Sequence, residues 1–215
     1  MAKKKGKTLP TVGVVGSGSF ATAIVKMLLE NAKLVHWCVR NEFVKGALEL
    51  RGHNPNYLTS VSFDVKKLAL TTDVNELVSA CDIIILAVPS IYLSDTIEKM
   101  TVDYSNKLFV SAIKGIVPKH NDVVAHYLRD VFKIEYKNQG VIAGPCHAEE
   151  VALERLSYLT IACGDAQKAK IVANCLSGNY IKAKISDDII DTEYAAMLKN
   201  IYLGQCFYNF LYIKY

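Results

Sequence analysis

Short hydrophobic runs alternate along this chain with longer segments in which hydrophobic residues recur at helical spacing. Thr11–Val15 and Ile83–Val88 have the hydrophobic character of strands buried on both faces, whereas Phe20–Glu30 has the spacing of an amphipathic helix. Strands are predicted at residues 11–15, 34–39, 68–71, 83–88, 108–112, 140–143, 158–163 and 180–185. Helices are predicted at residues 20–30, 42–50, 75–80, 91–100, 121–132, 147–154 and 165–176, with a last one from about Asp191. The alternation predicts an α/β fold with a doubly wound, mostly parallel sheet.

Composition narrows the class of protein. The 215 residues are 51% hydrophobic and 21% charged, which is typical of a globular protein and not of a disordered one. Four of the 25 basic residues lie in the opening MAKKKGK, which leaves 21 basic against 21 acidic residues in the rest. We therefore expect residues 1–10 to form a flexible lysine-rich tail on a neutral body, with no nucleic-acid partner.

Three further sequence patterns bear on where in the cell the protein works and on whether it binds a metal. No hydrophobic run approaches the ~20 residues that span a bilayer. Pro10 and the glycines and serines that follow the tail interrupt any signal-peptide pattern. The six cysteines are scattered singly, without a CxxC pair or histidines at metal-ligand spacing. We therefore expect a cytoplasmic protein with reduced thiols, no membrane insertion and no metal site.

The first predicted strand runs into a glycine-rich turn that begins the first predicted helix. The turn reads Gly16-Ser-Gly18-Ser-Phe-Ala21 and matches G-x-G-x-x-A. Gly16 permits the tight turn, Gly18 lets the backbone approach a pyrophosphate, and Ala21 allows close packing of helix and strand. The helix N-terminus presents N–H groups to the phosphates. This placement predicts a Rossmann-type fold that binds NAD or NADP; a turn needed only for packing is the alternative.

The end of the second predicted strand bears on the choice between NAD and NADP. An NAD-selective site normally has Asp or Glu there to hold the ribose hydroxyls. This chain has Arg40 at that point and no acid before Glu42. An arginine can face a 2′-phosphate or lie over the adenine, so Arg40 permits NADPH as the cofactor. A solvated loop arginine is the alternative.

Further strands end in segments with chemical character. The strand at 83–88 runs into Pro89, and the strand at 108–112 runs into Lys114. In a parallel sheet the ligand crevice lies at the carboxyl ends of the strands. Lys114 is therefore predicted to point toward a ligand and not into bulk solvent.

Seven blocks in order carry a family resemblance: GSGSFATA, WCVRN, HNPNYL, AVPS, SAIKG, GPCHAEEVA and AAMLKNIY. Together they resemble NAD(P)-dependent glycerol-3-phosphate dehydrogenase of the bacterial type, from about residue 11 to Tyr202. The resemblance implies an oxidoreductase that reduces dihydroxyacetone phosphate to sn-glycerol 3-phosphate with NAD(P)H, for glycerophospholipid synthesis in the cytoplasm. It thus implies a small phosphorylated substrate, and it is compatible with a homodimer, although the residues do not determine the oligomeric state.

The resemblance also implies roles for individual residues. Cofactor contacts are implied for Ser19, Phe20, Arg40, Lys114 and Ala148. Substrate contacts are implied for Lys114, Gly144, Cys146 and Asn200. Cys146 stands where Ser or Thr is expected, and a thiol is a weaker hydrogen-bond partner than a hydroxyl.

Lys199, in the LKN motif, matches the family's proton donor and acceptor. Hydride transfer to a ketone builds negative charge on the carbonyl oxygen, and a buried ammonium group can stabilise that charge and then supply a proton. By itself, a lysine in a helix such as AAMLKN is more often a surface residue. The catalytic roles of Lys199 and Lys114 therefore depend on the seven blocks taken together.

The resemblance stops near Tyr202. Family members continue into a helical domain, whereas residues 202–215 hold six aromatic residues out of 14. We interpret residues 11–188 as a dinucleotide-binding domain and residues 189–215 as the beginning of the helical substrate domain with an atypical tail. A truncated chain of this kind is expected to have impaired activity. A frameshift near codon 203 would explain the change in composition and predicts the helical domain in another frame just downstream.

Two other functions stay open. One is a non-catalytic module that holds NAD(P) without turning over substrate. The other is a different lysine-dependent ketoacid reductase, such as a ketopantoate reductase, although the AVPS, IKG and GPCHAEE blocks weigh against it. Cofactor binding without turnover would indicate the first, and a panel of ketone substrates would identify the second.

Overall fold

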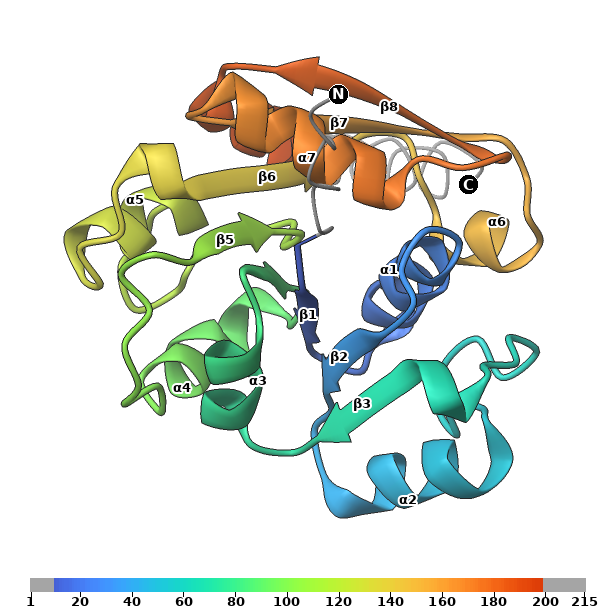
Figure 1. The fold of residues 1–215 in the computed structure, drawn as a ribbon. Coiled ribbons are helices and arrows are strands. Elements are labelled where there is room, and N and C mark those ends of the chain that lie inside the picture. The colour runs from blue at the N-terminus through green and yellow to red at the C-terminus, as the bar shows by residue number, and fades with distance from the viewer. Residues whose placement is uncertain (1–9, 199–215) are drawn as a thin grey trace, which may run out of the picture.

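An eight-stranded sheet forms the centre of the fold in the computed structural model, which describes residues 10–198 (Figure 1). The strands are β1 (Val12–Val15), β2 (Val35–Cys38), β3 (Leu68–Thr71), β4 (Ile83–Leu86), β5 (Leu108–Ser111), β6 (Gln139–Ala143), β7 (Ser157–Cys163) and β8 (Ile181–Ser186). Their order in the sheet is β3-β2-β1-β4-β5-β6-β7-β8. Strands β1 to β6 are parallel to one another, β7 is antiparallel to β6, and β8 is parallel to β7.

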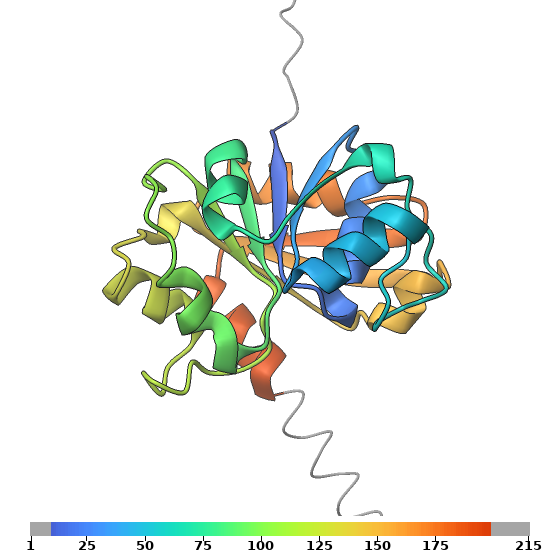
Figure 2. The ribbon, with the colours of Figure 1, turned by 90° about the horizontal axis from the view of Figure 1, so that it is seen from below.

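Helices cover both faces of this sheet (Figure 2). They are α1 (Ser19–Leu29), α2 (Glu42–Arg51), α3 (Val74–Ala80), α4 (Leu93–Ile97), α5 (Val124–Asp130), α6 (Ala148–Ala152) and α7 (Ala166–Leu176). Three short 3₁₀ segments, η1 (Val65–Lys67), η2 (Ser90–Tyr92) and η3 (Tyr136–Asn138), lie in the connections. A further helix covers residues 189–198, up to the last described residue.

Two main hydrophobic clusters hold the layers together. Residues of α1, α2, α6 and α7 pack in one cluster, and residues of α3, α4 and α5 pack in the other. Strand β1 contributes to both, because its side chains alternate between the faces: Val12 and Val14 point to the first cluster and Val15 to the second. The prediction of a doubly wound, mostly parallel sheet is confirmed.

A smaller third cluster lies under the helix at residues 189–198. Val141, Ala143 and Ala162 on β6 and β7 pack there against Ile189. Asp188 caps this helix, because its Oδ1 accepts the N–H of Asp191 at 2.9 Å. The helix that the sequence places near Asp191 therefore begins two residues earlier and lies against the sheet.

The reversal of direction at β7 is the main feature that the sequence pattern does not indicate. An α-helix rises about 1.5 Å per residue, so the five residues of α6 extend only about 8 Å. The five residues of β6 span about 17 Å. Helix α6 is therefore too short to return the chain to the amino end of the sheet, and β7 starts at the edge where β6 ended.

Helix α5 is shorter than the predicted range of 121–132. Its first residue is Val124, because the preceding segment forms an isolated antiparallel bridge between Val117 and Asp122. Asn121 has a φ of 49°, which is outside the helical region. The helix starts only after this turn is complete.

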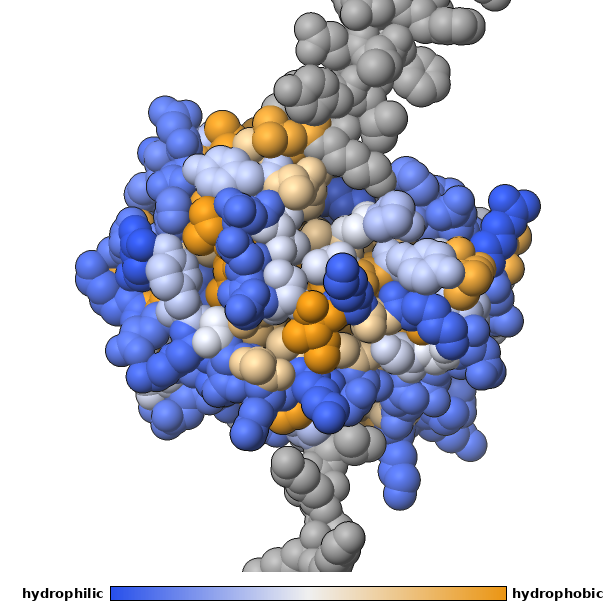
Figure 3. Space-filling view, turned by 90° about the horizontal axis from the view of Figure 1, so that it is seen from above, coloured by the Kyte–Doolittle hydropathy of each residue, from blue (hydrophilic) through white to orange (hydrophobic). Residues whose placement is uncertain are grey.

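The surface and the cysteines have the character that the composition predicts for a globular protein. Hydrophilic side chains dominate the face of the molecule seen in Figure 3, and hydrophobic ones gather there in small groups. In the part of the chain that the structure describes, no helix combines the length and the hydrophobicity needed to cross a bilayer. Five cysteines in this part are free thiols, and four of them are buried. Cys206 lies outside the described residues.

Gly140 provides a test of the packing at the reversal. A Cβ on Gly140 would lie 2.6 Å from Sγ of Cys163, its partner on β7. We expect Gly140→Ala to lower the free energy of unfolding by about 1–3 kcal/mol through overpacking. Adding Cys163→Ala, which removes the sulfur but leaves the carbonyl oxygen of Ala162 at 3.1 Å from this Cβ, should recover part of that loss in urea unfolding. A double variant no more stable than Gly140→Ala would show that this contact is not the cause.

Candidate functional site

A cavity of about 540 Å³ lies between the start of α1, the ends of β4 and β5, and the start of α6. The glycine turn lines it with Gly18, Ser19 and Phe20. The other walls are residues 87–90 after β4, residues 112–114 after β5, residues 146–149 before and in α6, and Tyr57. The segments that the sequence singles out at the strand ends therefore surround one cavity.

The two motif glycines have different environments. Gly16 has a φ of +124°, and a Cβ there would lie 2.4 Å from the carbonyl oxygen of Ala87. Any larger residue at Gly16 would push the turn away from β4. Around Gly18, by contrast, no atom lies within 4 Å of where a Cβ would stand. The turn is thus packed against the sheet at Gly16 and has open space beside its backbone at Gly18.

Two buried side chains hold the turn in this conformation. Nε1 of Trp37 donates a hydrogen bond to the carbonyl oxygen of Gly16 at 2.6 Å. Nδ2 of Asn54 donates to the carbonyl oxygen of Ser17 at 3.0 Å and to Oγ1 of Thr22 at 2.8 Å. Both side chains are fully buried. They bind the carbonyl groups of Gly16 and Ser17, and the N–H of Gly16 donates to the carbonyl oxygen of Cys38 at 2.9 Å. The residues that follow, Gly18, Ser19 and Phe20, line the cavity.

The start of α1 suits a bound anion. Gly18 is its N-cap residue and has no side chain to cap the helix, and the first turn contains no acidic residue. The N-caps of α2, α3 and α7 are instead Asn41, Asp73 and Asp165, whose side chains accept backbone N–H groups. Unsatisfied N–H groups and the positive end of the helix dipole favour negative charge at this point. A dinucleotide pyrophosphate fits this site by charge, by hydrogen bonding and by the space at Gly18.

Lys114 extends from the loop after β5 and lies between two cavities. Its Nζ is 4.7 Å from the centroid of the Phe20 ring, a cation–π contact that joins the lysine to the start of α1. Lys114 lines the 540 Å³ cavity and also a neighbouring pocket of about 280 Å³. The sequence-based prediction that Lys114 points toward a ligand crevice agrees with this placement.

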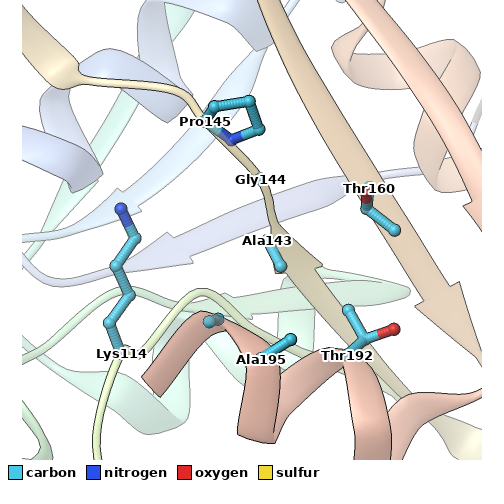
Figure 4. A pocket seen from close by; sticks show the side chains of 8 residues that line it. Lys114, Ala143, Gly144, Pro145, Thr160, Thr192 and Ala195 are labelled. Carbon is cyan, nitrogen blue, oxygen red and sulfur yellow. The ribbon is translucent and has the colours of Figure 1, made fainter. Parts of the chain in front are cut away.

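The smaller pocket lies between the end of β6, strand β7 and the helix at residues 189–198. Figure 4 shows Lys114 on one side of it, Ala143, Gly144 and Pro145 at and after the end of β6, Thr160 on β7, and Thr192 and Ala195 on the helix. Gly144 lines the pocket as well, with a φ of +120° that turns the chain away from the sheet. A Cβ at Gly144 would lie 2.8 Å from the carbonyl oxygen of Tyr158, so the turn requires glycine.

The turn before α6 brings two more of the predicted residues to the larger cavity. Cys146 and Ala148 are 1% and 7% exposed and line it. Cys146 therefore lines the larger cavity, as Lys114 does, and does not line the smaller pocket, where Gly144 lies. Glu149 and Glu150 occupy the first turn of α6, where their charge is favourable to the helix dipole.

Three other predicted site residues are Arg40, Lys199 and Asn200. Arg40 is exposed at the end of β2, and its N–H donates to Oγ of Ser17 at 3.4 Å. It is thus beside the glycine turn, and its contact with a cofactor stays a prediction. Lys199 and Asn200 lie outside the described residues, one and two positions after the last of them.

Glu193 is a buried carboxylate that the sequence analysis does not single out. Its side chain is on the helix at residues 189–198, and the residue is 2% exposed. Oε2 accepts the N–H of Ala125 at 2.9 Å, while Oε1 has no hydrogen-bond partner among the described residues. Burial raises the pKa of Glu193 to about 7, although the N–H groups of Ala125 and Val124, His126 and the Ser111 hydroxyl favour the charged form.

A glycine turn between a central parallel strand and an uncapped helix, in a sheet of this order, defines a Rossmann-type dinucleotide-binding protein. Comparison with protein families identifies which one. The model of the N-terminus of NAD-dependent glycerol-3-phosphate dehydrogenase matches residues 11–169, and the chain belongs to this family. The resemblance carried by the seven sequence blocks is confirmed, and NAD or NADP is the cofactor class of that family.

Individual relatives agree with this assignment. Glycerol-3-phosphate dehydrogenase (NAD(P)+) of Limosilactobacillus reuteri is 28% identical over 195 residues, which cover 88% of this chain and 57% of the relative. The enzyme of that name from Ectopseudomonas mendocina is 29% identical over 194 residues, 90% of this chain and 56% of the relative. The structure of glycerol-3-phosphate dehydrogenase from Plasmodium falciparum superposes with a TM-score of 0.81 at 25% identity, over 89% of this chain and 56% of that one. The chain spans about half the length of the curated relatives it matches.

The pKa of Glu193 predicts a pH dependence of stability. Its ordinary value is 4.5 and its folded value is about 7, so between these pH values the folded chain binds a proton that the unfolded chain has released. Stability therefore falls as pH rises through this window and is level above it, by an amount on the order of 3 kcal/mol. Glu193→Gln cannot titrate and should lack this component.

Urea unfolding at pH 5 and pH 8 measures the effect as the difference between wild type and Glu193→Gln. Because His126 faces the same carboxyl group, the comparison is repeated in a His126→Gln background. If the free energies of unfolding of wild type and Glu193→Gln differ by the same amount at pH 5 and pH 8, the raised pKa of Glu193 is contradicted.

Proposed function

We propose that this chain holds NAD or NADP in the 540 Å³ cavity and, as part of a glycerol-3-phosphate dehydrogenase, reduces dihydroxyacetone phosphate to sn-glycerol 3-phosphate. The observation that carries the proposal is the uncapped start of α1, which faces the cavity that Lys114 also lines. Membership of the family supports the same activity. We also propose that this enzyme works in the cytoplasm and serves glycerophospholipid synthesis.

Different residues of the chain are proposed to contact different parts of the cofactor. The N–H groups at Gly18, Ser19 and Phe20 bind the pyrophosphate, and the space at Gly18 lets it approach. Arg40, beside Ser17, is the side chain available to a 2′-phosphate. Ala148 and the end of β4 confine the far part of the cavity. When bound, the nicotinamide supplies the hydride.

Lys114 is proposed to act on the substrate from the neighbouring pocket. An ammonium group at the boundary of the two cavities attracts a small phosphorylated ketone and stabilises the negative charge that develops on its carbonyl oxygen. Among the described residues that line the 280 Å³ pocket none is acidic, so no carboxylate of this lining opposes the negative charge on the carbonyl oxygen. Lys199 is proposed as the proton donor and Asn200 as a substrate contact, both on the family resemblance.

Gly18 offers a test of cofactor binding that separates it from folding. Gly18→Ser introduces a side chain that can cap α1 itself, so we expect stability to be equal or slightly higher. The same hydroxyl competes for the N–H groups and fills the open space, so affinity for NADH or NADPH should fall about tenfold or more. Isothermal titration calorimetry and thermal unfolding measure the two effects.

The matched control is Gly46→Ser. Gly46 lies in α2 and, like Gly18, has no atom within 4 Å of a Cβ position, but it does not line the cavity. Its affinity for both cofactors should equal that of wild type. If wild type fails to bind either cofactor, or if Gly18→Ser binds as well as Gly46→Ser, the proposed site is wrong.

Turnover tests the reaction itself. Oxidation of NADPH or NADH is followed with dihydroxyacetone phosphate, both for this chain and for residues 1–198 joined to the remaining part of the Limosilactobacillus reuteri relative. We expect activity in the joined protein, and Lys114→Met should lower its kcat/KM by about 100-fold, the scale of losing one charge-stabilising group. Lys199→Ala, made in a joined protein that keeps this chain through residue 202, should abolish that activity.

The alternatives give different results in the same assay. Cofactor binding without turnover of any ketone in either protein would indicate a non-catalytic NAD(P)-binding module. Turnover of ketopantoate or another ketoacid, without turnover of dihydroxyacetone phosphate, would indicate a different lysine-dependent reductase.

A further inference from the structure

Glu193 is the only charged residue among the buried polar residues in the described part of the chain. It lines neither cavity, so binding of cofactor or substrate does not explain its burial. A buried carboxyl group is costly unless its contacts compensate for the loss of water. The contacts of Glu193 therefore indicate what its position achieves.

One set of contacts is with the start of α5. The N-cap residue of that helix is Val123, which has no side-chain acceptor, and Oε2 of Glu193 accepts the N–H of Ala125 at 2.9 Å. The neighbouring N–H of Val124 also favours the charged form of this carboxyl group and lowers its pKa. Glu193 thus caps α5 from 68 residues away in the sequence.

The other contact is with the end of β5. Oγ of Ser111 accepts the N–H of Ile113 at 3.3 Å, and the Ser111 hydroxyl lies near enough to the carboxyl group of Glu193 to lower its pKa. Ser111 is the last residue of β5, and Val124 is the first of α5. The contacts of Glu193 therefore lie at the two ends of the segment 112–123, which carries Lys114.

We propose that Glu193 is a positioning residue that ties both ends of the Lys114 segment to the helix at residues 189–198, and so fixes Lys114 between the two cavities. The same helix supplies Thr192, Ala195 and Ala196 to the smaller pocket. One carboxyl group then sets the lysine and the opposite pocket wall relative to each other. The proposal rests on the function proposed above, in which Lys114 acts on cofactor and substrate.

A purely structural role is the rival explanation. Ile113, Val117 and Val123 are buried, and they would hold the segment by hydrophobic packing alone. In that case the loss of Glu193 would lower stability without a specific effect on residues 112–125. The two explanations differ in which amides lose protection when Glu193 is replaced. They also differ in whether the loss of cofactor binding depends on Lys114.

Hydrogen exchange of the 215-residue chain without cofactor distinguishes them. In Glu193→Ala, amides in 112–125 should exchange about tenfold faster or more, beyond the change in the rest of the sheet. Glu193→Gln keeps an oxygen acceptor and should restore most of the protection. If Glu193→Ala does not fold, Ser111→Ala, which removes one end of the tie, should give a smaller increase confined to the same segment.

The matched control is Gln139→Ala. Gln139 is 1% exposed, donates through Nε2 to the carbonyl oxygen of Ile134, and like Glu193 has one buried oxygen without a partner. Its loss removes a buried polar side chain of similar size that does not contact the Lys114 segment. Equal exchange of residues 112–125 in the Gln139 and Glu193 variants would overturn the proposal.

A double-mutant cycle on NADPH binding gives the second readout. Glu193→Ala and Lys114→Met should each weaken binding, and the double variant should bind no more than about twofold more weakly than Lys114→Met. If the two substitutions weaken NADPH binding independently, their fold-changes multiply in the double variant. That result would contradict a role of Glu193 exerted through Lys114. If the wild-type chain binds neither NADH nor NADPH, the proposed function fails, whereas the exchange measurement still decides the role of Glu193.

Discussion

The absence of space for a side chain at Gly16 is the constraint on which the site depends. The turn approaches the carbonyl group of Ala87 so closely that a Cβ would lie 2.4 Å from its oxygen. This contact places the start of α1 over the carboxyl ends of β1 and β4, and Trp37 and Asn54 hold it there by occupying the carbonyl groups of Gly16 and Ser17. The first residues of α1 line the cavity and have no side-chain cap, so an anion there is the partner that their N–H groups favour.

The second part of the site depends on the loop after β5. Lys114 reaches the boundary of the two cavities because β5 ends three residues earlier, at the same edge of the sheet as β1 and β4. The cation–π contact with Phe20 connects this lysine to the start of α1. Charge is thus organised around one point, with a helix N-terminus on one side and an ammonium group on the other. A phosphorylated cofactor and a phosphorylated substrate suit such a field.

Much of this arrangement is predictable from the sequence, because hydrophobic periodicity and glycine spacing are local. The strands, most helices, the turn at Gly16 and the direction of Lys114 follow from such patterns. The reversal at β7 does not, since it depends on α6 being too short to cross the sheet. Asn54 and Glu193 are missed because their partners are 37 and 68 residues away. A carboxyl group at helical spacing from Ile189, on the face that packs on the sheet, is the signal that could have identified Glu193.

We propose the uncapped start of α1 as the site that holds the pyrophosphate of NAD or NADP. Titration of the ¹⁵N-labelled chain with NADPH tests it most directly, by following the backbone amide resonances of Gly18, Ser19 and Phe20. We expect saturable shifts of these three resonances that are larger than those of the capped N-termini of α2 and α7. Unchanged resonances at Gly18–Phe20 at saturating NADPH, or shifts centred elsewhere, would contradict it.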